Sequence, residues 1–333
     1  MSAHVFRWDL DKTYLATEFD SVKDLVGSFL QAAEEKRNIP GTAALMRELR
    51  YGPDGVRTRI HVVSGSPRQM RRVLERKLQL DGADVDSLTL KPNLRNALRL
   101  RFRALRDQVG YKLPALLTSR VSLADDAMET CFGDDAEMDG MVYRLYSDIC
   151  AGRVRGPELE AVIRAAKLYP DQAERIRAAA AQLPERDPVQ RILIHLETGS
   201  PTIRFEALGP RVVPTFNTFQ AALVLQADGR LTDQSVALVA AEMIDEYGYT
   251  PIRLAHSLED LLRRGVIEPG PVEAVAERVG FVMPRPSSLG VPPVESPVDY
   301  LQMLDEIHAY QRGRKARLGR GRTGIERLLG GGG

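Results

Sequence analysis

The chain has 333 residues, enough for one large domain with an extension or for two domains of ordinary size. Its 46 lysines and arginines nearly cancel its 45 aspartates and glutamates, which excludes a global charge that would attract nucleic acid or membranes. The two cysteines are too few for a disulfide framework, and no apolar run approaches the ~18 residues of a membrane span. Because the start also lacks a signal-peptide pattern, we expect a soluble, cytoplasmic protein.

The first predicted element is a short apolar strand that begins at His4 and ends abruptly in "DLDKT", residues 9–13. A strand interior does not tolerate Asp9 and Asp11, because a buried carboxylate costs several kcal/mol unless it is paired or bound to metal. These two acids are therefore expected at the carboxyl end of the strand. Helical spacing of apolar residues then predicts helices over residues 18–36 and 40–50.

Strands and helices continue to alternate along the next part of the chain. The predicted elements are a strand over 57–63 that breaks at Ser64-Gly65-Ser66-Pro67 before a helix, a strand over 86–90, a basic helix over 91–106, a helix beginning near Lys112, a strand ending in acids within 128–140, a strand over 189–196, and a strand and helix within 211–226. Such alternation predicts an α/β fold with a doubly wound, mostly parallel sheet that is covered on both faces.

From residue 231 the pattern contains helices only. We therefore divide the sequence into an α/β core over 1–230, a helical extension over 231–283, a proline-rich linker over 284–297, a helix over 298–311 and a basic, glycine-rich tail over 312–333. The tail, which includes Arg312, Arg314, Lys315 and Arg317, is expected to be disordered and to offer peripheral contacts to anionic surfaces.

Polar side chains follow three of the predicted strands at the point where each strand ends. They are Asp9 with Asp11, Ser64, and Asp134 with Asp139. In an open parallel sheet ligands bind beyond the carboxyl ends of the strands, so we expect these groups to share one crevice. Carboxylate oxygens are the ligands that Mg²⁺ prefers, and magnesium commonly binds a substrate phosphate as well.

A phosphate site also needs hydrogen-bond donors and a positive charge. Ser64 and Gly65 can supply hydroxyl and backbone donors, and Lys112 can supply the charge. Lys91 also follows a strand end and is an alternative to Lys112. Ser66 is expected to be a helix cap, and His195 is expected to be a packed core histidine.

The order "DLDKT", "VVSGS", Lys112 and "GDDAEMD" resembles the four motifs of the haloacid dehalogenase superfamily of phosphohydrolases. Within it, "PGTAALMREL" before "HVVSGSPRQM", then "YKLPAL" and "FGDDAEMD", is similar to the catalytic domain of the actin-patch-type phosphatidate phosphatases. The resemblance covers residues 5–220 and implies a haloacid dehalogenase-like Rossmannoid core. The short intervals between the motifs leave little or no room for a cap.

The resemblance implies a hydrolase that cleaves phosphoric monoesters. Asp9 would be the nucleophile that becomes an aspartyl phosphate, Asp11 the general acid and later the base, and Thr13 a support of the motif loop. Because the dehalogenase and ATPase branches of the superfamily lack an acid at the position of Asp11, its presence favours a phosphatase.

The other motifs would bind the phosphate and the metal. Ser64 and Gly65 would contact the phosphoryl oxygens, and Lys112 would neutralise charge. The metal-binding residues implied for magnesium are Asp9, Asp11 through its backbone carbonyl, Asp134 and Asp139. The role of Asp135 stays open.

The substrate is not fixed by these motifs. Lys12 and Asp135 differ from the residues usual in the lipid phosphatases, which leaves phosphatidate as one option beside a polynucleotide end or a phosphoprotein. The missing cap favours a bulky phosphorylated substrate. A non-catalytic scaffold that uses the same fold to bind partners is the alternative from another functional class.

Overall fold

The computed structural model describes residues 3–16, 32–91, 105–284, 286, 288–291, 294–310 and 312. Most of the helix expected over 18–36, most of the basic helix expected over 91–106 and the tail beyond residue 312 lie outside the described residues. Within the described part of the chain, no helix has the length and apolar character needed to cross a membrane.

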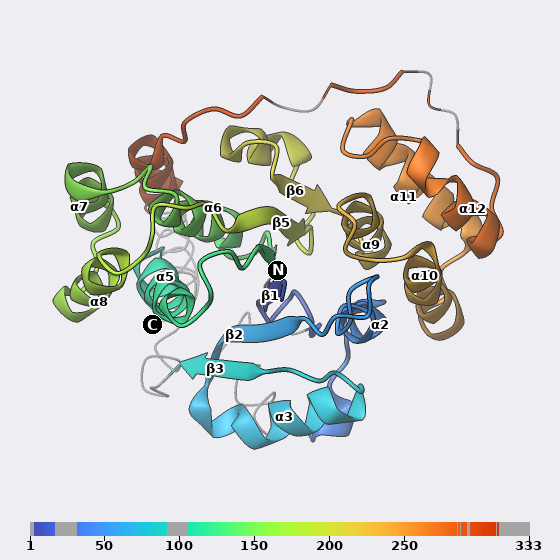
Figure 1. Cartoon of the computed structure of the whole chain (residues 1–333), viewed down its shortest axis with the longest axis horizontal. Coiled ribbons are helices and arrows are strands. Elements are labelled where there is room, and N and C mark those ends of the chain that lie inside the picture. The colour runs from blue at the N-terminus through green and yellow to red at the C-terminus, as the bar shows by residue number, and fades with distance from the viewer. Residues whose placement is uncertain are drawn as a thin grey trace, which may run out of the picture.

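The described residues form a six-stranded sheet flanked by helices (Figure 1). The strands are β1 (Val5–Trp8), β2 (Arg59–Pro67), β3 (Ser87–Lys91), β4 (Glu129–Asp134), β5 (Val189–His195) and β6 (Val212–Thr215). Their order is β3-β2-β1-β4-β5-β6, and every neighbouring pair is parallel. The doubly wound parallel sheet predicted from the sequence is therefore confirmed.

This strand order places a topological switch point beside β1. The chain adds β2 and β3 on one side of β1 and then returns to add β4, β5 and β6 on the other side. Phe6 of β1 is in register with Ile60 of β2 and with Thr130 of β4. The loops that leave β1 and β4 diverge here, and such a crevice is where open α/β sheets bind ligands.

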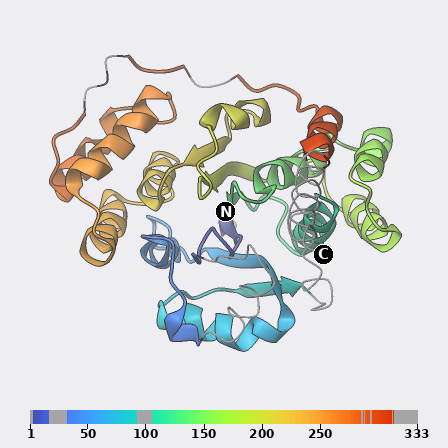
Figure 2. The same ribbon diagram turned by 180° about the vertical axis from the view of Figure 1, so that it is seen from behind.

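Helices cover both faces of the sheet (Figures 1 and 2). They are α2 (Thr42–Glu48), α3 (Arg71–Leu80), α5 (Leu105–Val121), α6 (Asp139–Cys150), α7 (Gly156–Ala165), α8 (Pro170–Ala180), α9 (Thr218–Ala227), α10 (Asp233–Tyr247), α11 (Pro251–Arg263) and α12 (Glu273–Val279). Short 3-10 helices are η1 (Ala33–Glu35), η2 (Arg68–Met70), η3 (Thr202–Leu208) and η4 (Gly270–Val272). Burial on both faces explains why β1 and β4 are buried at every position.

Two apolar cores lie on opposite faces of the sheet. One core joins side chains of α2, α3 and α9 to α11, and the other joins side chains of α5 to α8. The indole of Trp8 stacks on the ring of Phe132 at a centroid distance of 3.9 Å, which packs β1 against β4 directly beneath the crevice.

The C-terminal helices pack onto the core of the sheet. Gly41, at the start of α2, has a φ of +83°, and a Cβ there would lie 2.8 Å from the side chain of Met243 in α10. Residues 300–310 form a further helix, in which Tyr300 and Leu304 are buried against the second core. The hydroxyl of Tyr300 donates a hydrogen bond to Asp148.

Three details differ from the sequence prediction. β2 does not break at Ser64 but continues to Pro67, with a register shift against β3 between these two residues. α5 already includes Leu105, so Lys112 lies at least two turns inside the helix and not at its start. Helices α6, α7 and α8 have no counterpart in the predicted elements, although their apolar residues fill the second core.

A buried ion pair joins the two central strands below the crevice. The Arg7 side chain on β1 donates from Nη2 to Glu129 Oε1 on β4 at 3.1 Å, and both side chains are fully buried. The hydroxyl of Tyr146 also donates to Glu129, at 2.8 Å. Because a buried charge without a partner costs several kcal/mol, this ion pair stabilises the pairing of β1 with β4.

His4 should make the stability of the fold depend on pH. Burial, together with the charge of Arg230, lowers the pKa of His4 from 6.5 to about 3. The unfolded chain takes up a proton below pH 6.5 while the folded chain does not, so this stability is complete above pH 6.5 and is lost as the pH falls toward 3. Linkage predicts a loss of roughly 2 to 3 kcal/mol at pH 4.5, and His4→Asn should remove this dependence in urea unfolding measured between pH 4 and 8.

The exposed His256 provides the control for this experiment. His256→Asn should leave the curve of unfolding free energy against pH unchanged. Parallel curves for the wild type and His4→Asn would show that His4 is protonated in the folded state.

Candidate active site

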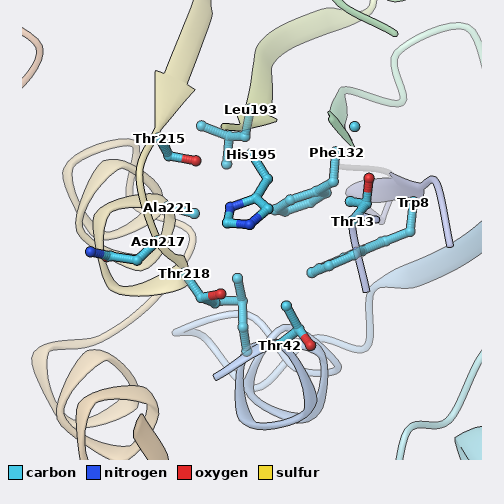
Figure 3. A pocket seen from close by; sticks show the side chains of 12 residues that line it. Trp8, Thr13, Thr42, Phe132, Leu193, His195, Thr215, Asn217, Thr218 and Ala221 are labelled. Atoms are coloured by element: carbon cyan, nitrogen blue, oxygen red, sulfur yellow. The ribbon is translucent and has the colours of Figure 1, made fainter. Parts of the chain in front are cut away.

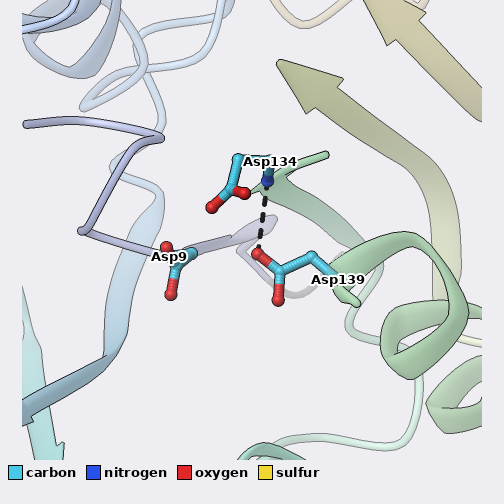
Figure 4. Close-up of side chains that lie close together, drawn as sticks. All are labelled: Asp9, Asp134 and Asp139. Atoms are coloured by element: carbon cyan, nitrogen blue, oxygen red, sulfur yellow. Dashed lines mark hydrogen bonds between the residues drawn. The ribbon is translucent and has the colours of Figure 1, made fainter. Parts of the chain in front are cut away.

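Three carboxylates meet in the crevice between β1 and β4 (Figure 4). Asp9 directly follows β1, Asp134 is the last residue of β4, and Asp139 is the first residue of α6. Each is 1% exposed, and the ligand oxygens that they offer lie within 4.8 Å of one another. The structure therefore brings these three predicted residues together.

Lys112 is the cation of this cluster. Its Nζ lies 2.9 Å from Asp9 Oδ1 and also contacts Asp139 Oδ1. Lys91, the alternative, instead places its Nζ 5.9 Å from the ring centroid of Tyr111. The lysine of the crevice therefore comes from α5. The sequence predicted a helix that begins near Lys112, whereas Lys112 lies inside α5.

Glu137 is a fourth acid that the sequence analysis missed. Its Oε2 lies 2.7 Å from Lys112 Nζ. The sequence contained a signal for Glu137, because this residue lies within "GDDAEMD", three residues after Asp134 and two before Asp139. The cluster thus has four carboxylates, and three of them, Asp9, Glu137 and Asp139, contact the ammonium group of Lys112.

Asp11 has a different environment from Asp9, although the two are only two residues apart. Ser64 Oγ and Ser66 Oγ both donate to Asp11 Oδ2, at 2.9 Å each. Ser66 is therefore not the helix cap that we expected, and Ser64 is bonded to Asp11 in this structure. Side chains two residues apart on a strand point to the same face. The spacing of Ser64 and Ser66 on β2 could therefore have predicted that the two hydroxyl groups lie together.

The remaining predicted residues lie around this centre. Thr13 Oγ1 donates to Asp9 Oδ2 at 3.4 Å. A Cβ built on Gly65 would meet no atom within 4 Å, so the backbone there borders open space. Asp135 leaves the cluster: its carboxylate accepts hydrogen bonds from the backbone N–H groups of Thr198 and Ser200, at 2.8 Å each, and so ties down the loop after β5.

A small pocket lies beside the ends of β1 and β4, and its lining includes no residue of the carboxylate cluster (Figure 3). Its volume of about 20 Å³ gives room for about one water molecule. The lining residues include Trp8, Thr13, Phe132, Gly133 and His195. The ring of His195 reaches into this pocket, with its Nε2 3.4 Å from Glu197 Oε2, so it is not the packed core histidine that we expected.

Burial and like charges shift the pKa values in the cluster. Burial raises the pKa of Asp9 well above its ordinary value, and Asp139 adds to this shift while Lys112 opposes it. Burial also raises the pKa of Asp134 and Asp139. Burial opposes the charge on Lys112, but the surrounding carboxylates outweigh it and raise the pKa of Lys112 well above the ordinary lysine value.

One carboxylate oxygen in this cluster has no partner. Asp134 Oδ1 accepts hydrogen bonds from the backbone N–H groups of Ala136 and Glu137, at 2.6 and 2.8 Å, but Asp134 Oδ2 is buried without any hydrogen bond. Such a buried orphan atom is costly unless it has a ligand. A hard cation with oxygen ligands fits Asp9, Asp134 and Asp139, whereas the side chain of Asp11 is directed to the serines.

Asp11 is buried, and its carboxylate accepts hydrogen bonds from two hydroxyl groups. Burial raises its pKa, and the hydrogen bonds from Ser64 and Ser66 oppose that shift. The two hydroxyl groups therefore hold the Asp11 carboxyl apart from the ion-paired cluster around Lys112. Two carboxyls with distinct surroundings are suited to distinct chemical roles.

Comparisons of the chain with models of known protein families, with curated proteins and with solved structures found no match. The functional assignment thus depends on these residues and their geometry.

Proposed function

We propose that the chain is a magnesium-dependent phosphomonoester hydrolase of the haloacid dehalogenase type, which works through an aspartyl phosphate on Asp9. One observation carries this proposal: Asp9 and Asp11 leave the same strand end, but Asp9 joins Lys112 and the acidic cluster while Asp11 is held separately by two serines. A nucleophile and a proton donor need this division of surroundings.

The side chains support a two-step hydrolysis in which atoms and protons balance. Asp9 attacks phosphorus, the bond from phosphorus to the leaving oxygen breaks, and Asp11 gives its proton to that oxygen. Water then attacks the aspartyl phosphate, Asp11 takes a proton from the water, and Asp9 is released with inorganic phosphate. Asp11 therefore returns to its starting state after each cycle.

Lys112, and magnesium held by the metal-binding acids, would stabilise the negative charge of the phosphoryl group. Lys112 lies 2.9 Å from Asp9 and offers a positive charge where the phosphoryl group would arrive. When bound by Asp9, Asp134 and Asp139, magnesium would supply further positive charge for the phosphoryl oxygens. The open backbone at Gly65 offers an N–H group to those oxygens, and Ser64 would orient Asp11 as well as contact the phosphate.

The substrate class follows from the surroundings of the site. The intervals between Asp9, Ser64 and Lys112 leave little room for a domain that would enclose the leaving group, so the rest of the substrate would extend outside the core. This supports a bulky phosphomonoester, such as a lipid phosphate of the phosphatidate type.

Release of phosphate from a small aryl phosphate tests the activity. We expect hydrolysis that requires magnesium and is lost in Asp134→Asn, because the amide replaces a charged ligand. Magnesium should also raise the thermal midpoint of the wild type by several degrees but not that of Asp134→Asn, which reports binding without turnover.

Asp135→Asn is the matched control for this pair, because Asp135 is the next residue but bonds to the loop after β5. It should keep the thermal response to magnesium. A wild-type protein that binds magnesium but hydrolyses no phosphomonoester would support the scaffold alternative.

A further inference from the structure

The two sides of the crevice carry side chains of opposite charge. The phosphoryl chemistry proposed above does not explain this difference. The acids Asp134, Glu137 and Asp139 lie on the side of β4 and α6. On the side of β1 and β2, basic residues flank Asp11 instead. They are Lys12 in the loop after β1, Lys36 in the segment before α2, and Arg68 at the start of η2.

Lys12 has a backbone conformation that lysine rarely adopts. Its φ is +62°, and only Lys167, at +55°, shares a positive φ among the non-glycine residues that the structure describes. Glycine or asparagine would fit this left-handed conformation with less strain. Strained backbone is concentrated at functional sites, which makes Lys12 a candidate for a role in this site.

The charge of Lys12 is not used inside the protein. Its side chain is half-buried and makes no ion pair or hydrogen bond with any residue that the structure describes. It directly follows Asp11, which places Lys12 at the same end of β1 as the proposed proton donor.

Arg68 is a second unused cation at the same edge. It follows Ser66 by two residues, and Ser66 contacts Asp11 directly. Arg68 is exposed and has no ion pair or hydrogen bond within the described part of the chain. Arg68 lies at the same end of β2 as the two serines that contact Asp11.

We propose that Lys12 and Arg68 form a second anion subsite, which binds a second phosphate carried by the leaving group of the substrate. β1 and β2 are adjacent parallel strands, so the residues that follow them lie at the same edge of the sheet. This inference rests on the proposed function, because it assigns the far side of the same site. It narrows the substrate to a phosphomonoester with a further anionic group.

The test compares a soluble hexose bisphosphate with the matching hexose monophosphate in the presence of magnesium. The wild type should have the higher kcat/KM on the bisphosphate. Lys12→Asn should lower the ratio of the two kcat/KM values by about tenfold, the effect of one charge-assisted hydrogen bond. Lys12→Arg should keep the ratio, and Arg68→Gln should lower it as well.

Lys167→Asn is the matched control, because it replaces an exposed lysine of the same backbone conformation after α7. It should change neither kcat/KM value. Equal losses on both substrates in Lys12→Asn, or an unchanged ratio, would overturn the second subsite while leaving the phosphatase activity standing.

A binding measurement separates this proposal from the proposed function. Asp9→Asn should bind the intact hexose bisphosphate more tightly than the monophosphate in calorimetry, and the double variant Asp9→Asn/Lys12→Asn should lose that preference. If the wild type hydrolyses neither these sugars nor an aryl phosphate but this preference is found, the subsite is correct and the hydrolase assignment is wrong. If vesicles with a lipid bisphosphate bind Asp9→Asn but not Asp9→Asn/Lys12→Asn, and the soluble sugar binds neither variant, the subsite serves a lipid headgroup.

Discussion

Asp9→Asn is expected to lower turnover of an aryl phosphate by more than about 100-fold, because an amide is a poor nucleophile and a weaker metal ligand. The fold should persist, since the amide has nearly the size of the carboxylate. The variant also removes one negative charge from a buried cluster in which burial and Asp139 already raise the pKa of Asp9. Its thermal midpoint without magnesium should therefore equal or exceed that of the wild type.

Steady-state kinetics with circular dichroism would check this prediction. Asp171→Asn is a suitable control, because Asp171 is exposed in the first turn of α8 and far from the crevice. Retention of more than about one hundredth of the wild-type rate by Asp9→Asn would remove Asp9 from the role of nucleophile.

Lys112→Met should both abolish turnover and destabilise the fold by about 3 to 5 kcal/mol, the cost of leaving buried charges without their partner. The Lys112 side chain is 2% exposed and is the ion-pair partner of Asp9, Glu137 and Asp139. Methionine keeps most of the volume of the side chain, so the loss would come from charge and not from a cavity. Urea unfolding at neutral pH without magnesium measures the effect.

Lys77→Met gives a matched comparison within the same protein. Lys77 is also a buried helical lysine, and its Nζ lies 2.6 Å from Asp81. Asp81 keeps hydrogen bonds from Tyr14 and Asn38 when Lys77 is replaced, so the loss of stability should be smaller and turnover should stay unchanged. Equal losses of stability in the two variants would show that the cluster around Lys112 carries no excess negative charge.

The placement of the carboxylates could be predicted because it depends on a local rule. Asp9 and Asp134 each end an apolar run, and a carboxylate without a buried partner is favoured where a buried parallel strand ends. The sheet then aligns these ends regardless of what lies between the strands. The fold class and the meeting of these two acids thus follow from pattern alone.

The partner of these acids depends on a contact that no local rule fixes. Lys91 ends β3 and Lys112 lies inside α5, and both fit a crevice at the carboxyl end of the sheet. Only the packing of α5 against α6 and β2 determines which ammonium group reaches Asp9. The sequence pattern therefore identifies Lys91 and Lys112 as candidate cations but does not determine which of them contacts Asp9.

The errors at Ser64 and Ser66 have a different origin. Glycine and proline in "SGSP" are typical of a turn, and this local preference predicted the end of the strand and a cap. Pairing of β2 with β3 keeps the segment extended to Pro67, with a register shift that accommodates it. As a result both hydroxyl groups turn toward Asp11, a tertiary effect that overrides the turn preference.

The pairing of Arg7 with Glu129 also affects the order in which the chain can fold. These two residues are 122 positions apart, and Glu129 is the ion-pair partner of Arg7 within the described part of the chain, so the charge of Arg7 is not neutralised until β4 has joined β1. During synthesis β1, β2 and β3 are complete long before β4 leaves the ribosome, so a nascent sheet would hold an unpaired arginine at its centre. Long-range pairing of this kind slows folding, and the nascent chain would stay open to chaperones and proteases until the second half of the sheet has been made.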